Sequence, residues 1–379
     1  MPYQTEPTLE HYASLNVLVV DDDLFINQLV QLRLRKRGYQ VSSAHNGKEA
    51  LAHIAQTPPD LIFLDVTMPE VDGLTVLQNI RRERFDIAVI MMTAYGSERV
   101  AVESLRQGAD DYLSKPFEAV DFDGVLERTV RRLLLTRQNA LLRRRLEQEM
   151  AAAAQVQADL LPSGLPSLPN FEMAAHFQPA RAVSGDFYDW SLNEDGTLNF
   201  TLADVMGKGM PAALLMAMAR PVMRVAGQLQ TPAQALNTAH NVMGADLERS
   251  GRFITLFHAR LKPATREVTY TDAGHGLGFV HRHNHCIEPL QSFGLPLGIF
   301  ADAIYSERTL TLTPGDHLVV YSDGLLEATG AASAGEDALA AVLTPDMSAQ
   351  QAITALLAQV VPTSELPDDL TVLALRCVA

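Results

Sequence analysis

Acidic residues stand at the ends of five short apolar segments of this chain. The segments carry the Val, Ile, Leu and Phe residues that are typical of buried strands. The acidic residues beside them are Asp21, Asp22 and Asp23, Asp65, Asp204, Asp323, and Asp368 with Asp369. Carboxylates gathered at strand ends repel one another and are costly to desolvate, so such clusters usually hold hard divalent cations. Two clusters in the first third and three in the second half predict one metal site in each of two domains.

Further polar residues complete the first of these sites. Asp21, Asp22 and Asp65 would meet at the carboxyl ends of two neighbouring strands, the edge at which open α/β sheets place their ligands. Thr93 and Lys115 follow later strand-like segments. Phosphoryl transfer to an aspartate requires a carboxylate nucleophile together with a divalent cation, a hydroxyl and a lysine, because the cation and the lysine offset charge on the phosphoryl oxygens.

About the first 120 residues resemble a CheY-like receiver domain of two-component signalling. The matching motifs are VVDDD at 19–23, LDVTMP at 64–69, DG at 72–73, TA at 93–94 and KPF at 115–117. The resemblance implies that Asp65 is the phosphoacceptor and that a sensor histidine kinase or phosphotransfer protein supplies the phosphoryl group. The implied Mg2+ ligands are Asp21, Asp22, Asp65 and the Thr67 carbonyl, and the implied switch residues are Thr93, Tyr112 and Lys115. The alternative is a flavodoxin-like module that is not phosphorylated.

A second acidic group lies in the second half of the chain. Its members are Asp186 and Asp189, Asp204, Asp323, and Asp368 with Asp369. Glycines follow Asp204 and Asp323 closely and let the backbone approach a ligand. A carboxylate-lined pair of cations suits hydrolysis of a phosphate ester, since the cations activate a water molecule and neutralise the phosphate. The sequence has no competing Cys or Ser nucleophile motif and no P-loop.

Residues 156–377 resemble the metal-dependent protein phosphatase (PPM) family, in its bacterial SpoIIE-type branch. The motifs are SGDFYD at 184–189, ADVMGKG at 203–209, AGH at 273–275, FGLPLG at 293–298, YSDG at 321–324 and PDDLT at 367–371. The resemblance implies an α-β-β-α sandwich that holds two Mn2+ or Mg2+ ions. The implied ligands are Asp204, which bridges the ions, the Val205 carbonyl on one ion, Asp323 and Asp368 on the other, Asp186 through a water, and Asp369 as a further candidate.

Three positions depart from the pattern of that branch. Ser184 replaces a glycine that often precedes Gly-Asp. Met206 and Lys208 occupy a loop that often carries Ser and His. The loop therefore offers no histidine to protonate a leaving group.

Two smaller features have competing interpretations. The alternating His281, His283 and His285 would share a strand face and suit a transition metal, or else belong to a polar hairpin. Arg181, just before the Asp186 motif, would clamp the phosphate of a substrate, or else lie on the surface.

Three segments must position these residues. Residues 15–119 alternate strand and helix patterns and predict an α/β receiver domain with a five-stranded parallel, flavodoxin-like sheet. Residues 120–162 predict a long helical linker. Residues 163–379 predict an α+β, PPM-type domain with antiparallel strands. Strands are expected in this last domain at 199–203, 253–261, 267–272, 277–281, 304–312, 317–321 and 370–377, and helices at 211–225, 232–249 and 349–361.

The linker shows a heptad pattern with polar interruptions. One series consists of Leu135, Leu142 and Val156, and the companion series of Leu146, Ala153 and Leu160. Asn139 and Glu149 interrupt the pattern. The linker is thus either a coiled coil through which the chain forms a homodimer, or an amphipathic helix packed on its own chain.

Composition limits the class of protein. A chain of 379 residues with 47% hydrophobic and 20% charged residues is globular, and the net charge of -15 argues against nucleic acid as a partner. Cys286 and Cys377 are far apart, which favours buried thiols in a reducing compartment. Without a secretory signal or a segment of membrane-spanning length, we expect a cytoplasmic protein that binds no membrane.

These features together predict a response regulator with a phosphorylation-controlled, metal-dependent serine/threonine phosphatase output. Family resemblance suggests that the substrate is a phosphorylated anti-sigma factor antagonist, a small STAS-fold protein. The alternative is a non-enzymatic adaptor with a degenerate phosphatase fold that binds a sigma factor or its regulator. A DNA-binding regulator is excluded because the chain has no basic output domain.

Overall fold

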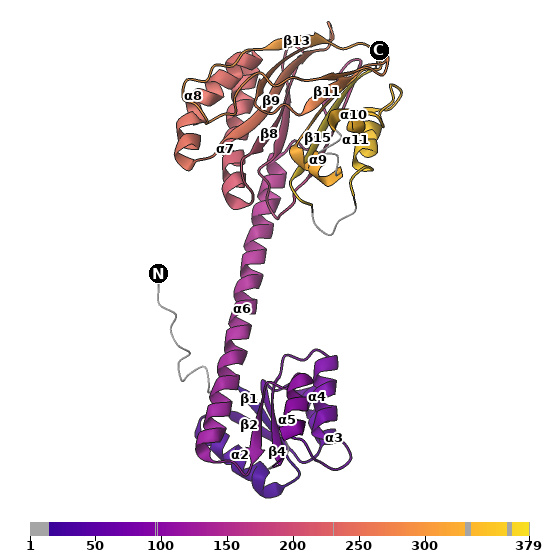
Figure 1. Cartoon of the computed structure of the whole chain (residues 1–379). Coiled ribbons are helices and arrows are strands. Elements are labelled where there is room, and N and C mark those ends of the chain that lie inside the picture. The colour runs from indigo at the N-terminus through magenta and orange to yellow at the C-terminus, as the bar shows by residue number, and fades with distance from the viewer. Residues whose placement is uncertain are drawn as a thin grey trace. The chain divides into compact units, whose positions relative to one another are not determined.

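The computed structural model describes residues 15–94, 96, 98–229, 231–329, 335–361 and 366–378. The chain forms two compact units, Met1–Arg145 and Leu146–Ala379, and each is described by itself (Figure 1). Within the described ranges, no helix is both long enough and apolar enough to span a bilayer.

The first unit is a five-stranded parallel sheet covered by helices on both faces. Its elements are β1 (Asn16–Val20), α2 (Leu24–Lys36), β2 (Gln40–Ala44), α3 (Gly47–Gln56), β3 (Leu61–Asp65), α4 (Gly73–Arg82), β4 (Ala88–Ala94), α5 (Glu98–Arg106), β5 (Asp111–Lys115) and the start of α6 (Ala119–Leu160). The strand order is β2-β1-β3-β4-β5, with every pair parallel. A separate apolar cluster fills each face, which confirms the predicted flavodoxin-like sheet.

Acidic residues also set where helices of this unit begin. The Asp23 carboxylate accepts hydrogen bonds from the backbone N–H groups of Phe25 and Ile26, so it caps α2. Asp72 accepts one from Thr75 and caps α4 in the same way. Such caps satisfy donors that the first turn leaves open. The Asp23 carboxylate is therefore used as a helix cap, whereas Asp21 and Asp22 lie just after the end of β1.

The helix α6 runs without a break from one unit into the other. In the first unit Phe122, Val130 and Leu133 are buried against the sheet. Further along, the heptad residues Leu142 and Leu146 are 53% and 55% exposed. The start of α6 therefore packs on its own chain, whereas the middle of the helix presents an apolar stripe.

The second unit consists of two antiparallel five-stranded sheets packed face to face. Their orders are β13-β10-β9-β8-β7 and β12-β11-β14-β15-β6. The strands are β6 (Phe171–Gln178), β7 (Phe187–Leu192), β8 (Leu198–Val205), β9 (Ile254–Lys262), β10 (Glu267–Ala273), β11 (Gly278–His281), β12 (Ile287–Pro289), β13 (Arg308–Thr311), β14 (His317–Tyr321) and β15 (Leu370–Cys377). The helices are α7 (Met210–Leu229), α8 (Pro232–Ser250), α9 (Asp323–Thr329), α10 (Gly335–Ala340) and α11 (Ala349–Leu357).

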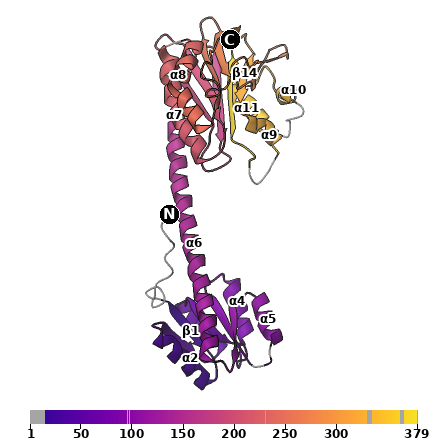
Figure 2. The same cartoon turned by 60° about the vertical axis from the view of Figure 1, so that its left-hand side comes forward.

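Helices cover the outer faces of both sheets. Helices α7 and α8 pack on the first sheet and α9 to α11 on the second, so that Figure 2 shows the two helical layers on opposite sides of the strands. A third apolar cluster, which includes Phe200, Phe257 and Leu373, fills the space between the sheets. The predicted α-β-β-α sandwich is confirmed.

Several local predictions in this unit were wrong or incomplete. Strands β6, β7 and β12 and helices α9 and α10 were missed. The strand predicted at 304–312 begins only at Arg308, because Asn237 of α8 hydrogen-bonds both the N–H and the carbonyl of Tyr305 and holds this backbone away from the sheet. Cys377 is buried as expected, but Cys286 is exposed because it lies in the hairpin between β11 and β12.

Candidate functional site

The first candidate site lies at the carboxyl ends of β1, β3 and β5. Asp21 is fully buried at the end of β1, and Asp65 is 7% exposed at the end of β3. The Nζ atom of Lys115 lies 2.7 Å from Oδ2 of Asp21 and 2.8 Å from Oδ1 of Asp65. One carboxylate oxygen from each of Asp21, Asp22 and Asp65 lies within 4.8 Å of the others. Three close oxygen ligands of this kind fit a hard cation such as Mg2+.

Burial and charge oppose each other in this site. Burial raises the pKa of both Asp21 and Asp65, although the Lys115 ammonium counteracts the shift. Burial would lower the pKa of Lys115, but its hydrogen bonds with the two carboxylates prevail and raise it. The carboxylates therefore depend on a neighbouring cation to stay charged.

The other predicted receiver residues lie on β4, on β5 and in the loop after β3. Thr93 is buried near the end of β4, whereas Tyr112 is 42% exposed on β5 and Thr67 is exposed in the loop after β3. Gly73 closes this loop on the strand: a Cβ at Gly73 would lie 2.0 Å from the carbonyl oxygen of Asp65. Only glycine lets α4 begin this close to the acceptor residue.

The second candidate site lies at one end of the sandwich. Asp186 precedes β7, Asp204 belongs to β8, Asp323 begins α9 and Asp368 stands before β15. One carboxylate oxygen each of Asp323, Asp368 and Glu327 lies within 4.8 Å of the others. The oxygens come from two helical positions one turn apart and from a strand end.

Burial and, after it, mutual repulsion raise the pKa values of the acids in this second site. Burial and the charges of Asp323 and Asp368 raise the pKa of Asp204 to about 7. Burial and then the Asp204 charge raise the pKa of Asp186 well above its usual value. Burial and Asp368 likewise raise the pKa of Asp323. All-oxygen ligands that repel one another in this way fit divalent cations, which would remove the repulsion.

Hydroxyl groups and backbone N–H groups hold the remaining acids in place. Thr371 Oγ1 donates to Asp186 Oδ2 at 2.6 Å. The Asp369 carboxylate accepts from Ser184 Oγ at 2.7 Å and from the N–H groups of Gly185 and Ala180 at 2.9 and 2.8 Å. Because both of its oxygens are already hydrogen-bonded, Asp369 fixes the backbone before Asp186. Its role as a metal ligand stays a prediction.

Sequence-family models match both units. Residues 17–127 match the response regulator receiver domain, and residues 194–378 match the family of stage II sporulation protein E (SpoIIE). The chain joins a receiver domain to a SpoIIE-type PPM phosphatase domain. The receiver match contains Asp21, Asp22 and Asp65, and the SpoIIE match contains Asp204, Asp323 and Asp368.

Individual relatives match one domain or the other. Phosphoserine phosphatase RsbU of Bacillus subtilis is 33% identical over 188 residues, which are 49% of this chain and 56% of that protein. Response regulator MprA of Mycobacterium ulcerans is 43% identical over 140 residues, 37% of this chain and 55% of that protein. The chain thus spans about half the length of the curated relatives it matches.

A solved structure shares the fold of the second unit. The SiaA-PP2C domain of Pseudomonas aeruginosa is 20% identical with a TM-score of 0.53, and the match covers 62% of this chain and 99% of that chain. At this level of identity the likeness shows the fold alone.

Some residues of the SpoIIE-type domain were missed by sequence reasoning. Lys208 Nζ lies 2.8 Å from Asp368 Oδ2, and Glu327 joins the Asp323 group. The spacing of Glu327, four residues after Asp323 on one helix, was an available signal. Lys208 was noticed only as a departure from the family pattern. Arg181 is exposed and makes no hydrogen bond or ion pair with any residue the structure describes.

The histidines of the hairpin do not converge on one point. The ring of His281 lies 5.7 Å from that of His285, whereas His283 Nδ1 lies 3.4 Å from Asp316. Among the described residues, the groups that are close enough to hold an ion are both acidic and contain none of these histidines. The geometry favours the polar hairpin.

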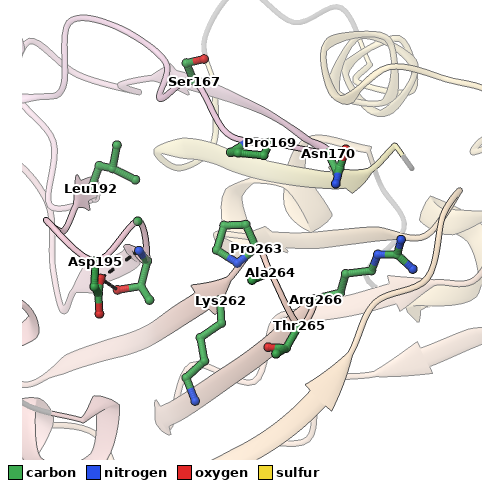
Figure 3. Close-up of a pocket in the computed structure, with 12 residues that line it drawn as sticks. Ser167, Pro169, Asn170, Leu192, Asp195, Lys262, Pro263, Ala264, Thr265 and Arg266 are labelled. Carbon is green, nitrogen blue, oxygen red and sulfur yellow. Dashed lines mark hydrogen bonds between the residues drawn. The ribbon is translucent and has the colours of Figure 1, made fainter.

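A cavity of about 650 Å³ lies at the opposite end of the SpoIIE-type domain (Figure 3). Its walls include Lys262 and Arg266 from the β9–β10 turn and Asp195 from the β7–β8 turn, where Thr197 donates two hydrogen bonds to Asp195. The β7–β8 turn precedes β8, whereas Asp204 lies near the far end of β8. Given the rise per residue of a strand, the turn and Asp204 are roughly 20 Å apart. This cavity is therefore separate from the carboxylates.

Proposed function

We propose that this chain is a metal-dependent protein serine/threonine phosphatase under the control of phosphorylation at Asp65. The observation that carries the proposal is the gathering of Asp186, Asp204, Asp323 and Asp368 in one place, with raised pKa values for the first three. Such a site is unfavourable unless cations occupy it.

Each residue has a separate task in this proposal. Two divalent cations in the site would offset charge on a phosphate ester and lower the pKa of a water molecule. Asp204 interacts with the Asp186, Asp323 and Asp368 carboxylates, which supports the proposal that it is the ligand shared by both cations. The hydrogen bond to Asp368 raises the pKa of Lys208, so Lys208 keeps its proton and attracts the phosphate instead of acting as the acid.

The substrate class follows from similarity and from the site. Likeness to phosphoserine phosphatase RsbU supports a phosphoserine or phosphothreonine protein. We propose a phosphorylated anti-sigma factor antagonist of the STAS fold, which after dephosphorylation would sequester an anti-sigma factor and release a sigma factor. The retained acidic ligands argue against the alternative, a non-enzymatic adaptor for a sigma factor or its regulator.

Phosphate release from a phosphoserine-containing STAS protein tests this function. Hydrolysis is expected with Mn2+ or Mg2+, with none above background in excess chelator and full recovery after either metal is restored. A phosphotyrosine peptide serves as the control substrate. Hydrolysis that persists in chelator contradicts the mechanism, and binding of a sigma-factor regulator without any hydrolysis indicates the adaptor.

We further propose that α6 carries the signal as a coiled coil in a homodimer. Leu135, Leu142, Leu146 and Val156 occupy its heptad positions and are 51%, 53%, 55% and 63% exposed. A second copy of the same stripe would bury these side chains. Phosphorylation can act through the helix only if the two receiver states differ in the free energy of this pairing.

Replacing Leu142 and Leu146 together with Glu is expected to convert the dimer to a monomer and to abolish the response of the phosphatase to beryllofluoride, a phosphoryl mimic. Like charges in the seam would repel each other across the pair. Light-scattering mass and phosphatase rate report the two effects. Leu141→Glu is the control, because Leu141 is 51% exposed but lies outside the heptad positions. A double variant that still responds like the parent would show that the helix is only a tether.

A further inference from the structure

Gln157 connects α6 with the backbone that leads to Asp186. Its side chain is buried within the SpoIIE-type domain, with 7% exposed. Its Nε2 donates to the Ser184 carbonyl at 2.8 Å, and its Oε1 accepts from the Ser184 N–H at 2.8 Å. One side chain thus satisfies both backbone groups of a buried residue, as a neighbouring strand would.

Ser184 in turn hydrogen-bonds the side chain of Asp369 and the backbone of Asp186. Its hydroxyl donates to Asp369 Oδ2 at 2.7 Å and accepts from the Asp186 N–H at 2.9 Å. Gly185 N–H donates to the same Asp369 oxygen. The backbone from Ser184 to Asp186 is therefore held from α6 on one side and from the start of β15 on the other.

Other polar residues near this end of α6 are not placed to do this. Gln155 is exposed and its amide bonds Asp159 on the next turn. Leu161, just after the helix, is buried among the residues of α7 and α8. Apolar packing thus fixes the end of the helix against the domain. The two hydrogen bonds of Gln157 then fix the position of the Ser184 backbone relative to the helix.

We propose that Gln157 is a positioning residue that holds Asp186 in place for divalent cations. The affinity of the site for metal then depends on where the end of α6 packs in the SpoIIE-type domain. The proposal rests on the proposed function in taking cations as the ligands of the carboxylates. Hydrogen bonds behind metal ligands typically change metal affinity by about 10- to 100-fold.

Calorimetric titration of the full chain with Mn2+ tests this role. The titrations use an Asp22→Asn background, which removes one receiver ligand so that binding reports the SpoIIE-type site. Gln157→Leu removes both hydrogen bonds, and the isosteric Gln157→Glu replaces the donor with an oxygen that repels the Ser184 carbonyl. Each variant is expected to raise the Kd for Mn2+ by about tenfold. Gln155→Leu, the same change on an exposed side of the helix, is expected to leave the Kd within about twofold.

Two further readouts separate positioning from mere packing. At saturating Mn2+ the kcat of the Gln157 variants is expected to return to the parent value with an unchanged KM for the phosphoprotein. Hydrogen exchange of the Ser184 amide is expected to become faster in Gln157→Leu, which removes the acceptor of this N–H. Gln157→Glu keeps the shape of the parent, so it remains informative if Gln157→Leu does not fold.

Unchanged Mn2+ affinity in Gln157→Glu, with only a lower Tm, would overturn the proposal and leave Gln157 as a packing residue. A parent chain that binds no Mn2+ at the SpoIIE-type site would overturn both this proposal and the proposed function. Weakened binding in the variants supports the role of Gln157 even if the parent hydrolyses no phosphoprotein, so failure of the proposed function remains distinguishable.

Discussion

Asp204→Asn is expected to lower the kcat for phosphoprotein hydrolysis by about a thousand-fold, which corresponds to ~4 kcal/mol of lost transition-state stabilisation. Asp204 interacts with Asp186, Asp323 and Asp368, so its loss would affect both of the proposed cations at once. The amide keeps the size of the side chain but removes the charge. Because the charge of Asp204 is unfavourable in the absence of metal, the variant is expected to fold at least as stably as the parent without metal.

The measurement is the rate of phosphate release at saturating Mn2+, with the unfolding transition as a check on folding. Asp195→Asn is the matched control, since Asp195 is exposed in a turn at the opposite end of the domain. It is expected to retain full activity. If Asp204→Asn retained more than about a tenth of the parent rate, the shared-ligand role of Asp204 would be wrong.

Asp65→Ala is expected to abolish labelling of the receiver domain by a small phosphodonor such as acetyl phosphate in the presence of Mg2+. Asp65 is the carboxylate that reaches the edge of β3 beside both Lys115 and the Asp21–Asp22 pair. Lys115 and a cation held by these carboxylates would offset the charge of an incoming phosphoryl group on Asp65. Removing the nucleophile therefore removes the acceptor and leaves the surrounding site in place.

Intact-mass spectrometry measures this result directly. The parent is expected to gain one phosphoryl group and Asp65→Ala none. Asp121→Ala, a change of an exposed acid in the first turn of α6, is expected to label like the parent. Equal labelling of the Asp65 variant would assign phosphorylation to a different residue and would remove the basis for control of the phosphatase by this site.

Sequence patterns predicted those parts of the fold that depend on local apolar content. The strands β1, β3 and β8 are mostly apolar and each has an aspartate at or next to its last residue, so the strands and the site residues at their ends could be predicted together. The helix α6 was predicted to within about a residue at each end, since no proline or late glycine interrupts it.

Other parts of the fold depend on partners that are distant in the chain. Strand β7 contains Asp189, which pairs with Arg220 and Arg224 of α7. A charged residue interrupts the apolar pattern of the strand, and its partners could not be predicted from the sequence, so the strand was missed. The role of Gln157 depends on Ser184, 27 residues away, and no spacing rule connects an amide on a helix with a loop backbone. Likewise Lys208 meets Asp368 only because β8 ends and β15 begins at the same edge of the sandwich.

The tight backbone crossings beside the carboxylates restrict how this protein can vary. A Cβ at Gly73 would collide with the carbonyl of Asp65, and a Cβ at Gly324 would lie 2.1 Å from the carbonyl oxygen of Asp369. Every single-base change that alters the meaning of a glycine codon introduces a larger side chain or a stop. A substitution at either glycine therefore cannot adjust the neighbouring site in small steps. Tolerated substitutions are expected instead in loops and surfaces further from the acids.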